Sequence, residues 1–277
     1  MKSVGHLSID SVTLPPGGEW KAAAEGWNFL HVTRGAAYWL EGDHPRSLTE
    51  GEMLVVPPVL HGVVRASQIG PVVLHAVRFA PDLLCGFFTL SERHFFESGA
   101  AGALAETQFL PSTHPVTQQF ASLAQQAGSA SNTLTRRIQV LSLVAAVFDK
   151  EVARHHAPEE LGSTALHRFM QLIAEMPDTE IINHTPEQLA RLCGCSPRHF
   201  NRLFRQHFGA SARSRQTELR LLKARQLLGD SDSKIIQVAM ESGYRNLSLF
   251  NSLFKRRFGT TPSGWRRKVR KRNGAER

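Results

Sequence analysis

Apolar residues between positions 26 and 80 alternate with polar ones or gather in short runs. Trp27, Phe29 and His31 share one parity, and Gly and Pro residues separate the runs at a spacing of roughly ten residues. Further short apolar runs follow at residues 53–56, 63–64 and 72–79. Short strands with regular turn signals predict a β-sandwich or β-barrel in this part of the chain.

The pattern becomes helical after about residue 112. Residues 116–126 and 133–155 contain no Gly or Pro. In the second stretch, apolar residues recur at three- and four-residue steps, as on one face of a helix. This stripe consists of Ile138, Leu141, Val144 with Ala145, Phe148 and Val152. The stripe either packs on the β-domain or pairs with a second copy of the chain, and the pattern leaves both open. A short linker is expected to follow.

Local capping signals predict short helices in the remainder of the chain. Thr185 precedes Pro186 and Gln188, which is an N-cap with Pro in the first turn and a capping-box partner. Gly209 and Gly259 each follow a Phe, as C-terminal stops of helices do.

An internal repeat organises these helices. The run Phe-Asn-Arg-Leu-Phe-Arg at 200–205 returns fifty residues later as Phe-Asn-Ser-Leu-Phe-Lys at 250–255. Upstream, the Leu-Ala…Cys-Gly pattern at 189–194 matches Val-Ala…Ser-Gly at 238–243. Each copy is therefore expected to be a short helix, a turn with Gly and a second helix. The small Ala lets the helices approach closely and the Gly permits a positive φ, so both copies are predicted helix-turn-helix units.

The second helix of each copy has an apolar face and a polar face. Burial is expected for Phe200, Leu203 and Phe204, and for Phe250, Leu253 and Phe254. Arg and Asn side chains on the opposite face suit base edges in a major groove, and the N-caps leave backbone amides for a phosphate. The candidate DNA-binding residues are Ser196, Arg198, His199, Asn201, Arg202 and Arg205, then Arg245, Asn246, Ser248, Asn251, Ser252, Lys255 and Arg256.

One helix over Ser211–Leu228 is expected to join the two copies. About 17 residues rise ~25 Å. This length is enough to direct two recognition helices toward neighbouring major-groove turns, which lie ~34 Å apart along B-DNA.

Charge divides the chain just after the predicted linker. The 277 residues carry a formal net charge of +9. Residues 1–165 hold 11 basic and 15 acidic side chains, a net charge of −4, whereas residues 166–277 hold 22 and 9, a net charge of +13. A basic module that carries two groove-reading helices indicates double-stranded DNA as the partner, rather than RNA or a membrane.

Composition excludes several other classes of protein. Hydrophobic residues make up 42% and charged residues 21%, which is typical of a globular chain. The longest apolar runs fall short of the about 18 residues that a spanning helix needs. The first twenty residues lack the regions of a secretion signal. Cys85, Cys193 and Cys195 form no disulfide framework, so we expect a reduced, cytoplasmic setting.

Residues Leu166–Arg267 resemble the DNA-binding domain of the AraC/XylS family of bacterial transcription regulators. The most specific segment runs Ile235-x-x-Val238-Ala239-x-x-x-Gly243-Tyr244, then Phe250-x-x-x-Phe254-Lys255-x-x-Phe258-Gly259-x-x-Pro262-x-x-Trp265-Arg266. The resemblance implies that two helix-turn-helix units bind adjacent major-groove segments of a promoter. It places the recognition helices at Pro197–His207 and Leu247–Arg257.

The two recognition helices differ in a way that predicts unequal roles. The second has Ser248 and Ser252 where the first has Arg198 and Arg202. We therefore expect the first helix to supply most of the base readout. The second helix is expected to depend on phosphate contacts from Arg245, Lys255, Arg256 and Arg257, with the basic segment Arg266–Arg272 as an added electrostatic contact.

Residues 26–80 resemble the cupin-like sensor domain that commonly precedes this DNA-binding domain. Gly51-x5-Pro57-x3-His61 approximates the second cupin motif, one residue short between Pro and His. His31, His61 and His75 could converge in a barrel interior, but a metal site needs three or four oriented ligands and the motif is incomplete, so no metal is predicted.

A pocket for an organic effector is the alternative use of these strands. Aromatic rings and an arginine suit such a pocket. The candidate lining residues are Trp27, His31, Trp39, His61 and Arg78.

Together these features predict an α+β multidomain chain. A cupin-like β-barrel sensor is expected at 1–110, a helical dimerisation segment with a linker at 111–163, and an AraC-type all-α domain with two helix-turn-helix units at 164–277. The expected function is sequence-specific binding of promoter DNA under the control of a small-molecule effector. The expected assembly is a homodimer, RNA polymerase is a further partner if the chain is an activator, and no enzyme activity, cofactor or membrane partner is predicted.

Two alternatives stay open at this point. The DNA-binding chain could respond to a partner protein, or act constitutively, with no small molecule. A metal-dependent cupin enzyme joined to a DNA-binding domain is the less favoured alternative, because its ligand set is incomplete.

Overall fold

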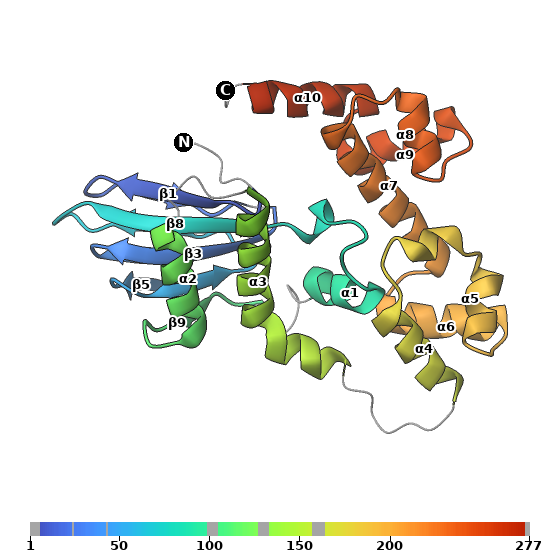
Figure 1. Ribbon diagram of the computed structural model, residues 1–277, viewed down its shortest axis with the longest axis horizontal. Helices are drawn as coiled ribbons and strands as arrows, with labels where there is room; N and C mark the ends of the chain where they lie inside the picture. Colours follow the sequence, from blue (N-terminus) through green and yellow to red (C-terminus); the bar gives the residue numbers. More distant parts are fainter. Residues whose placement is uncertain are drawn as a thin grey trace. The chain divides into compact units, whose positions relative to one another are not determined.

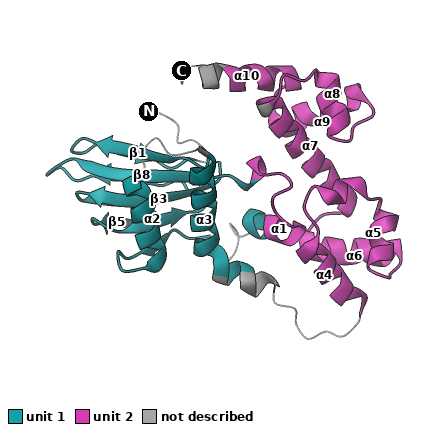
Figure 2. Cartoon of the chain, in the orientation of Figure 1, with its two compact units in different colours: residues 1–81, 95–155 teal, residues 82–94, 156–277 magenta. Residues whose placement is uncertain are grey.

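A computed structural model describes residues 6–23, 25–42, 44–98, 105–126, 133–156 and 164–274. The chain forms two compact units: unit 1 comprises residues 1–81 and 95–155, and unit 2 comprises residues 82–94 and 156–277 (Figure 2). Strands fill unit 1 and short helices fill unit 2, which confirms the α+β multidomain class (Figure 1). Residues 105–126 and 133–155 belong with the strands, and Asp82–His94 belongs with the C-terminal helices.

Two antiparallel sheets form most of unit 1. The five-stranded sheet has the order β1-β8-β3-β6-β9 and the four-stranded sheet has the order β2-β7-β4-β5. The strands are β1 (Ile9–Leu14), β2 (Glu19–Lys21), β3 (Trp27–Arg34), β4 (Ala37–Glu41), β5 (His44–Leu48), β6 (Met53–Val56), β7 (Val63–Ala66), β8 (Val72–Phe79) and β9 (Gln108–Leu110). Alternation and short apolar runs in the sequence predicted most of these strands.

Strand β3 presents its alternate residues to two different environments. Leu30 and Val32 pack in the core between the two sheets. Trp27 and Phe29 point the other way, and their rings lie 4.8 and 6.1 Å from the ring of Phe148, centroid to centroid. Phe148 belongs to α3 (Thr133–His156), which together with α2 (Pro115–Gln125) covers the outer face of the five-stranded sheet (Figure 1). The sheet is therefore buried on both faces.

Helix α3 packs on the sheet through a stripe that differs in part from the predicted one. Val140, Val144 and Phe148 are buried and recur at four-residue steps along one face. The prediction is right at Val144 and Phe148. It is wrong at Ile138, which is 58% exposed. Since the Phe148 ring fixes the rotation of the helix, the residue two positions before Val140 lies on the opposite side, facing solvent.

Unit 2 is built from short helices. They are η1 (Pro81–Leu83, of which Asp82 and Leu83 lie in this unit), the start of α1 (Leu90–Ser98), α4 (Ala165–Glu175), η4 (Glu180–Asn183), α5 (Pro186–Leu192), α6 (Pro197–Phe208), α7 (Ala212–Asp230), α8 (Ile235–Glu241), α9 (Leu247–Phe258) and α10 (Pro262–Gly274). The expected recognition helices are α6 and α9, and each extends one residue beyond the predicted end. The segment expected as a basic tail is helical in α10. Among the described residues, no helix combines the length and the apolar character needed to cross a bilayer.

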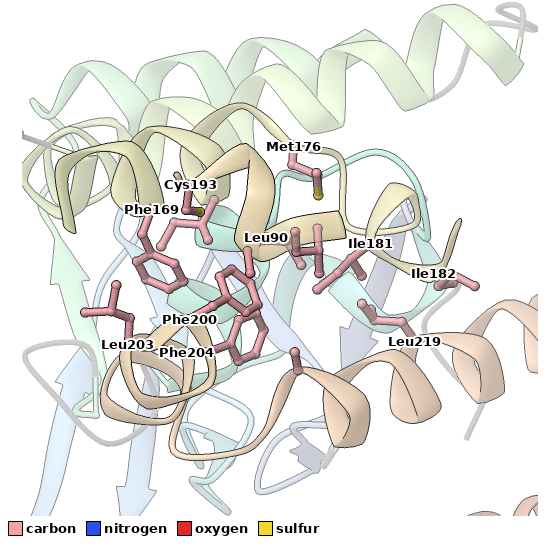
Figure 3. Packing of buried hydrophobic residues seen from close by; sticks show 14 of the residues in the cluster. Leu90, Phe169, Met176, Ile181, Ile182, Cys193, Phe200, Leu203, Phe204 and Leu219 are labelled. Carbon is pink, nitrogen blue, oxygen red and sulfur yellow. The ribbon is translucent and has the colours of Figure 1, made fainter. Parts of the chain in front are cut away.

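Helix α7 is built into two separate hydrophobic cores of unit 2. Leu219 and Leu222 pack in the first core, with α4, α5 and α6 (Figure 3). Leu221, Ala224 and Leu228 pack in the second core, with α8 and α9. Because one rigid helix contributes to both cores, it determines the spacing of the two helix-turn-helix units.

Candidate DNA-binding site

The first helix-turn-helix unit consists of α5, a turn and α6. The predicted capping box at Thr185 and Gln188 is present, and both of its hydrogen bonds form. Ala190 is fully buried where the two helices cross. The turn passes through Gly194 with φ +60°, a conformation that costs a residue with a Cβ about 1 kcal/mol or more. The local sequence therefore accounts for the start of α5, its crossing and its turn.

The second helix-turn-helix unit repeats this construction with α8 and α9. Ala239 is buried at the helix crossing, and Gly243 makes the turn with φ +84°. Tyr244 follows the turn, and its hydroxyl donates to the backbone oxygen of Thr217 in α7 at 3.3 Å. Burial raises the pKa of Tyr244 to about 12, so this hydroxyl keeps its proton at neutral pH. The tyrosine thus ties the second turn to the connecting helix.

Helix α6 presents a basic surface opposite its buried face. Phe200, Leu203 and Phe204 are buried, as predicted. The exposed residues of the candidate set are Arg198, Arg202 and Arg205, and His199 and Asn201 are half-buried beside them. The ring nitrogen Nδ1 of His199 lies 3.3 Å from Nη2 of Arg202. One face of α6 therefore collects guanidinium, imidazole and amide groups.

Helix α9 presents a different surface. Phe250 and Phe254 are buried as predicted, whereas Leu253 is only half-buried. Its exposed positions include Leu249, which is 53% exposed and which the sequence analysis did not single out. The other candidates on or next to this helix are exposed at Arg245, Asn246, Ser248, Ser252, Lys255 and Arg256, and half-buried at Asn251. Short hydroxyls and an apolar side chain thus replace the arginines at the start of the helix.

Two candidate residues act as N-caps. The Ser196 hydroxyl oxygen accepts from the amide of His199 at 3.2 Å, and the Asn246 side-chain oxygen accepts from the amide of Leu249 at 2.9 Å. Each side chain thereby satisfies one amide and orients the first turn of a recognition helix. The Ser196 hydroxyl group and the side-chain NH2 group of Asn246 can still donate hydrogen bonds to a ligand.

Arg257, expected to contact phosphate, forms an ion pair within unit 2. Its Nε donates to Oε1 of Glu218 in α7 at 2.7 Å. The guanidinium also lies over the ring of Phe258, at 5.3 Å from the centroid. Among the cations of the second recognition helix, Arg257 therefore has its charge partly compensated by a carboxylate.

The five candidate pocket residues of unit 1 lie in different environments. Trp27 and His31 are buried on the face that α2 and α3 cover, whereas Trp39 lies in the core between the sheets. His61 is exposed, and Arg78 donates from Nε to a backbone carbonyl at 2.8 Å. Trp39 lies in the other sheet and faces the core between the sheets, whereas Trp27 and His31 face the helices, so the five side chains do not meet at one site.

Two of the three candidate histidines are neighbours. His31 of β3 lies directly opposite His75 of β8. Burial lowers the pKa of both rings, and the proximity of His75 lowers that of His31 further. The rings are therefore neutral at pH 7. In the part of the chain that the structure describes, no three His, Cys, Asp or Glu side chains are grouped to hold a metal ion.

Comparison with known proteins identifies the family. A model described as a helix-turn-helix domain matches residues 189–268, which contain α6, α7, α8 and α9. The RCS-specific HTH-type transcriptional activator RclR of Escherichia coli K12 is 30% identical over 200 residues, which are 68% of this chain and 68% of RclR. The chain belongs to the AraC/XylS family of transcription regulators. This AraC/XylS regulator thus binds DNA through helix-turn-helix units, as the repeat predicted.

Another relative and a solved structure match smaller shares of this AraC/XylS regulator. The HTH-type transcriptional regulator GlxA of Rhizobium meliloti is 34% identical over 158 residues, 56% of this chain and 47% of GlxA. The chain thus spans about half the length of GlxA. A solved AraC-type regulator structure from Chromobacterium violaceum is 28% identical, with a TM-score of 0.33, and covers 38% of this chain and 91% of that one.

Proposed function

We propose that α6 and α9 enter two adjacent major-groove segments of a promoter. The observation that carries this proposal is the insertion of α7 into both hydrophobic cores of unit 2, which gives the two recognition helices one fixed spacing. Both helices also begin at a side-chain N-cap and end at a glycine with φ +68°. Two equivalent helices on one rigid connector suit consecutive turns of one face of B-DNA.

The chemistry of the exposed faces supports unequal roles. Arg198, Arg202 and Asn201 on α6 offer bidentate donors for guanine and adenine edges. Helix α9 offers Lys255 and Arg256 to phosphates, which position the helix without reading sequence. Leu249 adds an apolar contact, which is the chemistry that recognises a thymine methyl group. The first half of the site would therefore be read by hydrogen bonds and the second by phosphate position and thymine methyls.

Substitution of one arginine and one lysine tests this division. Duplexes are first selected from a random pool with the full chain. Arg202→Ala is expected to lose about 1–3 kcal/mol of discrimination at one base position, whereas Lys255→Ala is expected to weaken all sequences alike. Arg65→Ala, an exposed arginine of unit 1, is the matched control. If Arg202→Ala kept its discrimination between DNA sequences and Lys255→Ala lost it, the roles of α6 and α9 would be the reverse of those proposed.

We further propose that a small-molecule effector binds unit 1 at the face of the sheet that α2 covers. Within the described chain, Nδ1 of His31 and Nε1 of Trp27 are buried without a hydrogen-bond partner. The His31 ring packs on Phe120 of α2 at 5.6 Å, centroid to centroid. Buried polar atoms without partners are costly, and a bound polar molecule would satisfy them. His61 and Trp39 would then have no part in this site.

Effector control is tested on the full chain. Mapping the genomic sites that the chain binds indicates candidate compounds from the neighbouring genes. A true effector is expected to raise the thermal unfolding midpoint and to change the affinity for DNA, and His31→Phe should abolish both effects while His61→Ala keeps them. Regulation by a partner protein or constitutive activity is the alternative, and it predicts neither effect for any compound. All relatives named above are regulators of transcription, so we propose no catalytic role.

A homodimer formed through the outer face of α3 completes the proposal. Leu134 and Ile138 are 63% and 58% exposed on this helix, which is unusual for neighbouring large apolar residues. Ile138→Glu is expected to convert a dimer to a monomer in sedimentation. Ile69→Glu, at another exposed isoleucine of unit 1, should leave the assembly unchanged. If the dimer activates transcription, RNA polymerase is a further partner.

A further inference from the structure

A segment of the N-terminal half is part of the DNA-binding unit. Residues Asp82–His94, called the strap below, belong to unit 2 (Figure 2). The side chain of Leu90 lies in the first hydrophobic core, among Phe169 of α4 and Phe200 and Phe204 of α6 (Figure 3). The first helix-turn-helix unit therefore has a core that residues 164–277 alone do not complete.

The strap pairs with the segment after α4 through its backbone. The amide of Leu90 donates to the carbonyl oxygen of Met176 at 3.0 Å, and the amide of Asp178 donates to the carbonyl oxygen of Phe88 at 2.8 Å. The amide of Gly86 donates to Oδ1 of Asp178 at 2.6 Å. These bonds hold residues 86–90 of the strap against the segment after α4.

A buried ion pair lies at the centre of this contact. Nε of Arg93 donates to Oδ2 of Asp178, and both side chains are completely buried. Arg93 also donates from Nη2 to the carbonyl oxygen of Leu84 at 3.1 Å. A charge buried in this way requires its partner, because the loss of either one leaves an uncompensated charge away from water. The pair therefore selects one placement of the strap over shifted ones.

The strap also reaches the two helices that organise DNA binding. The His94 ring lies 4.9 Å from the ring of Phe208 and 5.2 Å from that of His207, centroid to centroid, at the end of α6. Arg225 of α7 donates from Nη2 to the carbonyl oxygen of Asp82 at 3.0 Å, and the same nitrogen forms an ion pair with Oδ2 of Asp82 at 3.6 Å. One segment thus contacts the first recognition helix and the connecting helix.

Both ends of the strap continue into unit 1. Pro81 precedes it, and Phe95 follows it within the same helix, α1. Phe95 and Phe96 pack in unit 1 against Phe148 of α3, at 6.1 and 5.3 Å between ring centroids. Phe148 is the residue that contacts Trp27 on the proposed effector face. Helix α1 therefore contributes Leu90 to the first hydrophobic core of unit 2, and Phe95 and Phe96 to the packing around Phe148 in unit 1.

We propose that the strap positions α6 and couples unit 1 to DNA binding, with His94 and Asp82 as its positioning residues. This inference rests on the proposed function of α6. A coupling free energy is reciprocal, so DNA that prefers one placement of α6 must also stabilise the strap that holds it.

Hydrogen exchange and footprinting of the full chain test the coupling. The probe is the duplex DNA selected above from a random pool. Binding is expected to slow exchange at the amides of Gly86, Leu90 and Asp178. His94→Ala is expected to weaken DNA binding by about 5-fold or more. In the footprint, the DNA segment that Arg202→Ala assigns to α6 should lose its protection, and the other DNA segment should keep it. His61→Ala, at an exposed histidine of unit 1, is the matched control.

Asp82→Asn weakens the contact with Arg225 and buries no new charge. It is also expected to weaken DNA binding and to reduce footprint protection over the segment assigned to α6. A variant that merely unfolds would lose protection over both segments, which overturns a positioning role. Unchanged exchange at the three amides, with His94→Ala binding as tightly as His61→Ala, also overturns it. If the chain selects no duplex at all, the proposed function fails and the coupling fails with it.

Discussion

Arg168 donates a hydrogen bond from Nε to the backbone carbonyl oxygen of Cys193, at 2.8 Å. Cys193 is the last residue before the turn glycine of the first helix-turn-helix unit, and Arg168 belongs to α4, outside the repeat. The second unit has a counterpart, because Arg220 of α7 lies 3.0 Å from the position that a Cβ on Gly243 would occupy. An arginine from a neighbouring helix therefore lies beside each turn glycine, and Arg168 also donates a hydrogen bond to its turn.

We expect Arg168→Met to destabilise unit 2. The substitution keeps most of the aliphatic length but removes a charged donor from a carbonyl oxygen, a bond that contributes about 1.5–3 kcal/mol. The free energy of unfolding, measured by urea denaturation of the full chain, is expected to fall by about this amount. Arg191→Met, at an exposed arginine of α5, should change it by less than ~0.5 kcal/mol. Equal losses in the two variants would contradict the role given to Arg168.

Two glycines with the same backbone conformation allow the cost of left-handed backbone strain to be measured separately from the cost of steric crowding. Gly194 has φ +60° and Gly209 has φ +68°. A Cβ on Gly194 would lie 2.9 Å from Nη2 of Arg168, whereas a Cβ on Gly209 would meet nothing within 4 Å. Gly209→Ala is therefore expected to lose only the about 1–2 kcal/mol of left-handed strain. Gly194→Ala should lose more, because Arg168 must also move, and urea denaturation of both variants measures the difference.

The fold of unit 2 was largely predictable because its signals are local. The caps at Thr185 and Ser196, the glycine stops and the fifty-residue repeat each depend on a few neighbouring residues, and the helix ends lie within one residue of those predicted for α6 and α9. The strap was not predictable. Arg93 and Asp178 are 85 residues apart, and neither shows a periodic pattern that would indicate burial of a charge.

The candidate sites divide in the same way. The polar face of α6 follows from helical periodicity, so its exposed arginines were predictable. The environments of Trp27 and Trp39 were not, because both sheet faces are buried here and alternation cannot tell an inner face from one covered by helices. Leu249 carried a usable signal, since it is apolar on the side opposite Phe250 and Phe254.

Unit 1 is expected to lose stability as the pH falls below about 6.5. Burial, and then the nearby His75, lower the pKa of His31 in the folded chain. As the pH falls, the unfolded chain therefore binds a proton at a higher pH than the folded chain does. The stability present at neutral pH is lost as the pH falls through the ordinary histidine range. Urea midpoints at pH 7.5 and 5.5 measure the loss. His31→Gln is expected to reduce it and His61→Gln to leave it unchanged, and the same loss in both would exclude His31 as its source.

Removal of a carboxylate beside α9 is expected to tighten DNA binding. Glu218 accepts from Nε of Arg257 at 2.7 Å, and the two side chains are 29% and 45% exposed, so solvent already weakens the pair. Glu218→Gln would release the guanidinium toward a phosphate, and each added phosphate contact steepens the dependence of log affinity on log salt by about 0.9. Titrations of the selected duplex at several salt concentrations measure this slope. Glu175→Gln, on α4 away from the repeat, is the control. An unchanged slope in Glu218→Gln would mean that Arg257 does not reach the DNA backbone. Weaker binding with an unchanged slope would mean that Glu218 supports the structure of α9 and does not act through its charge.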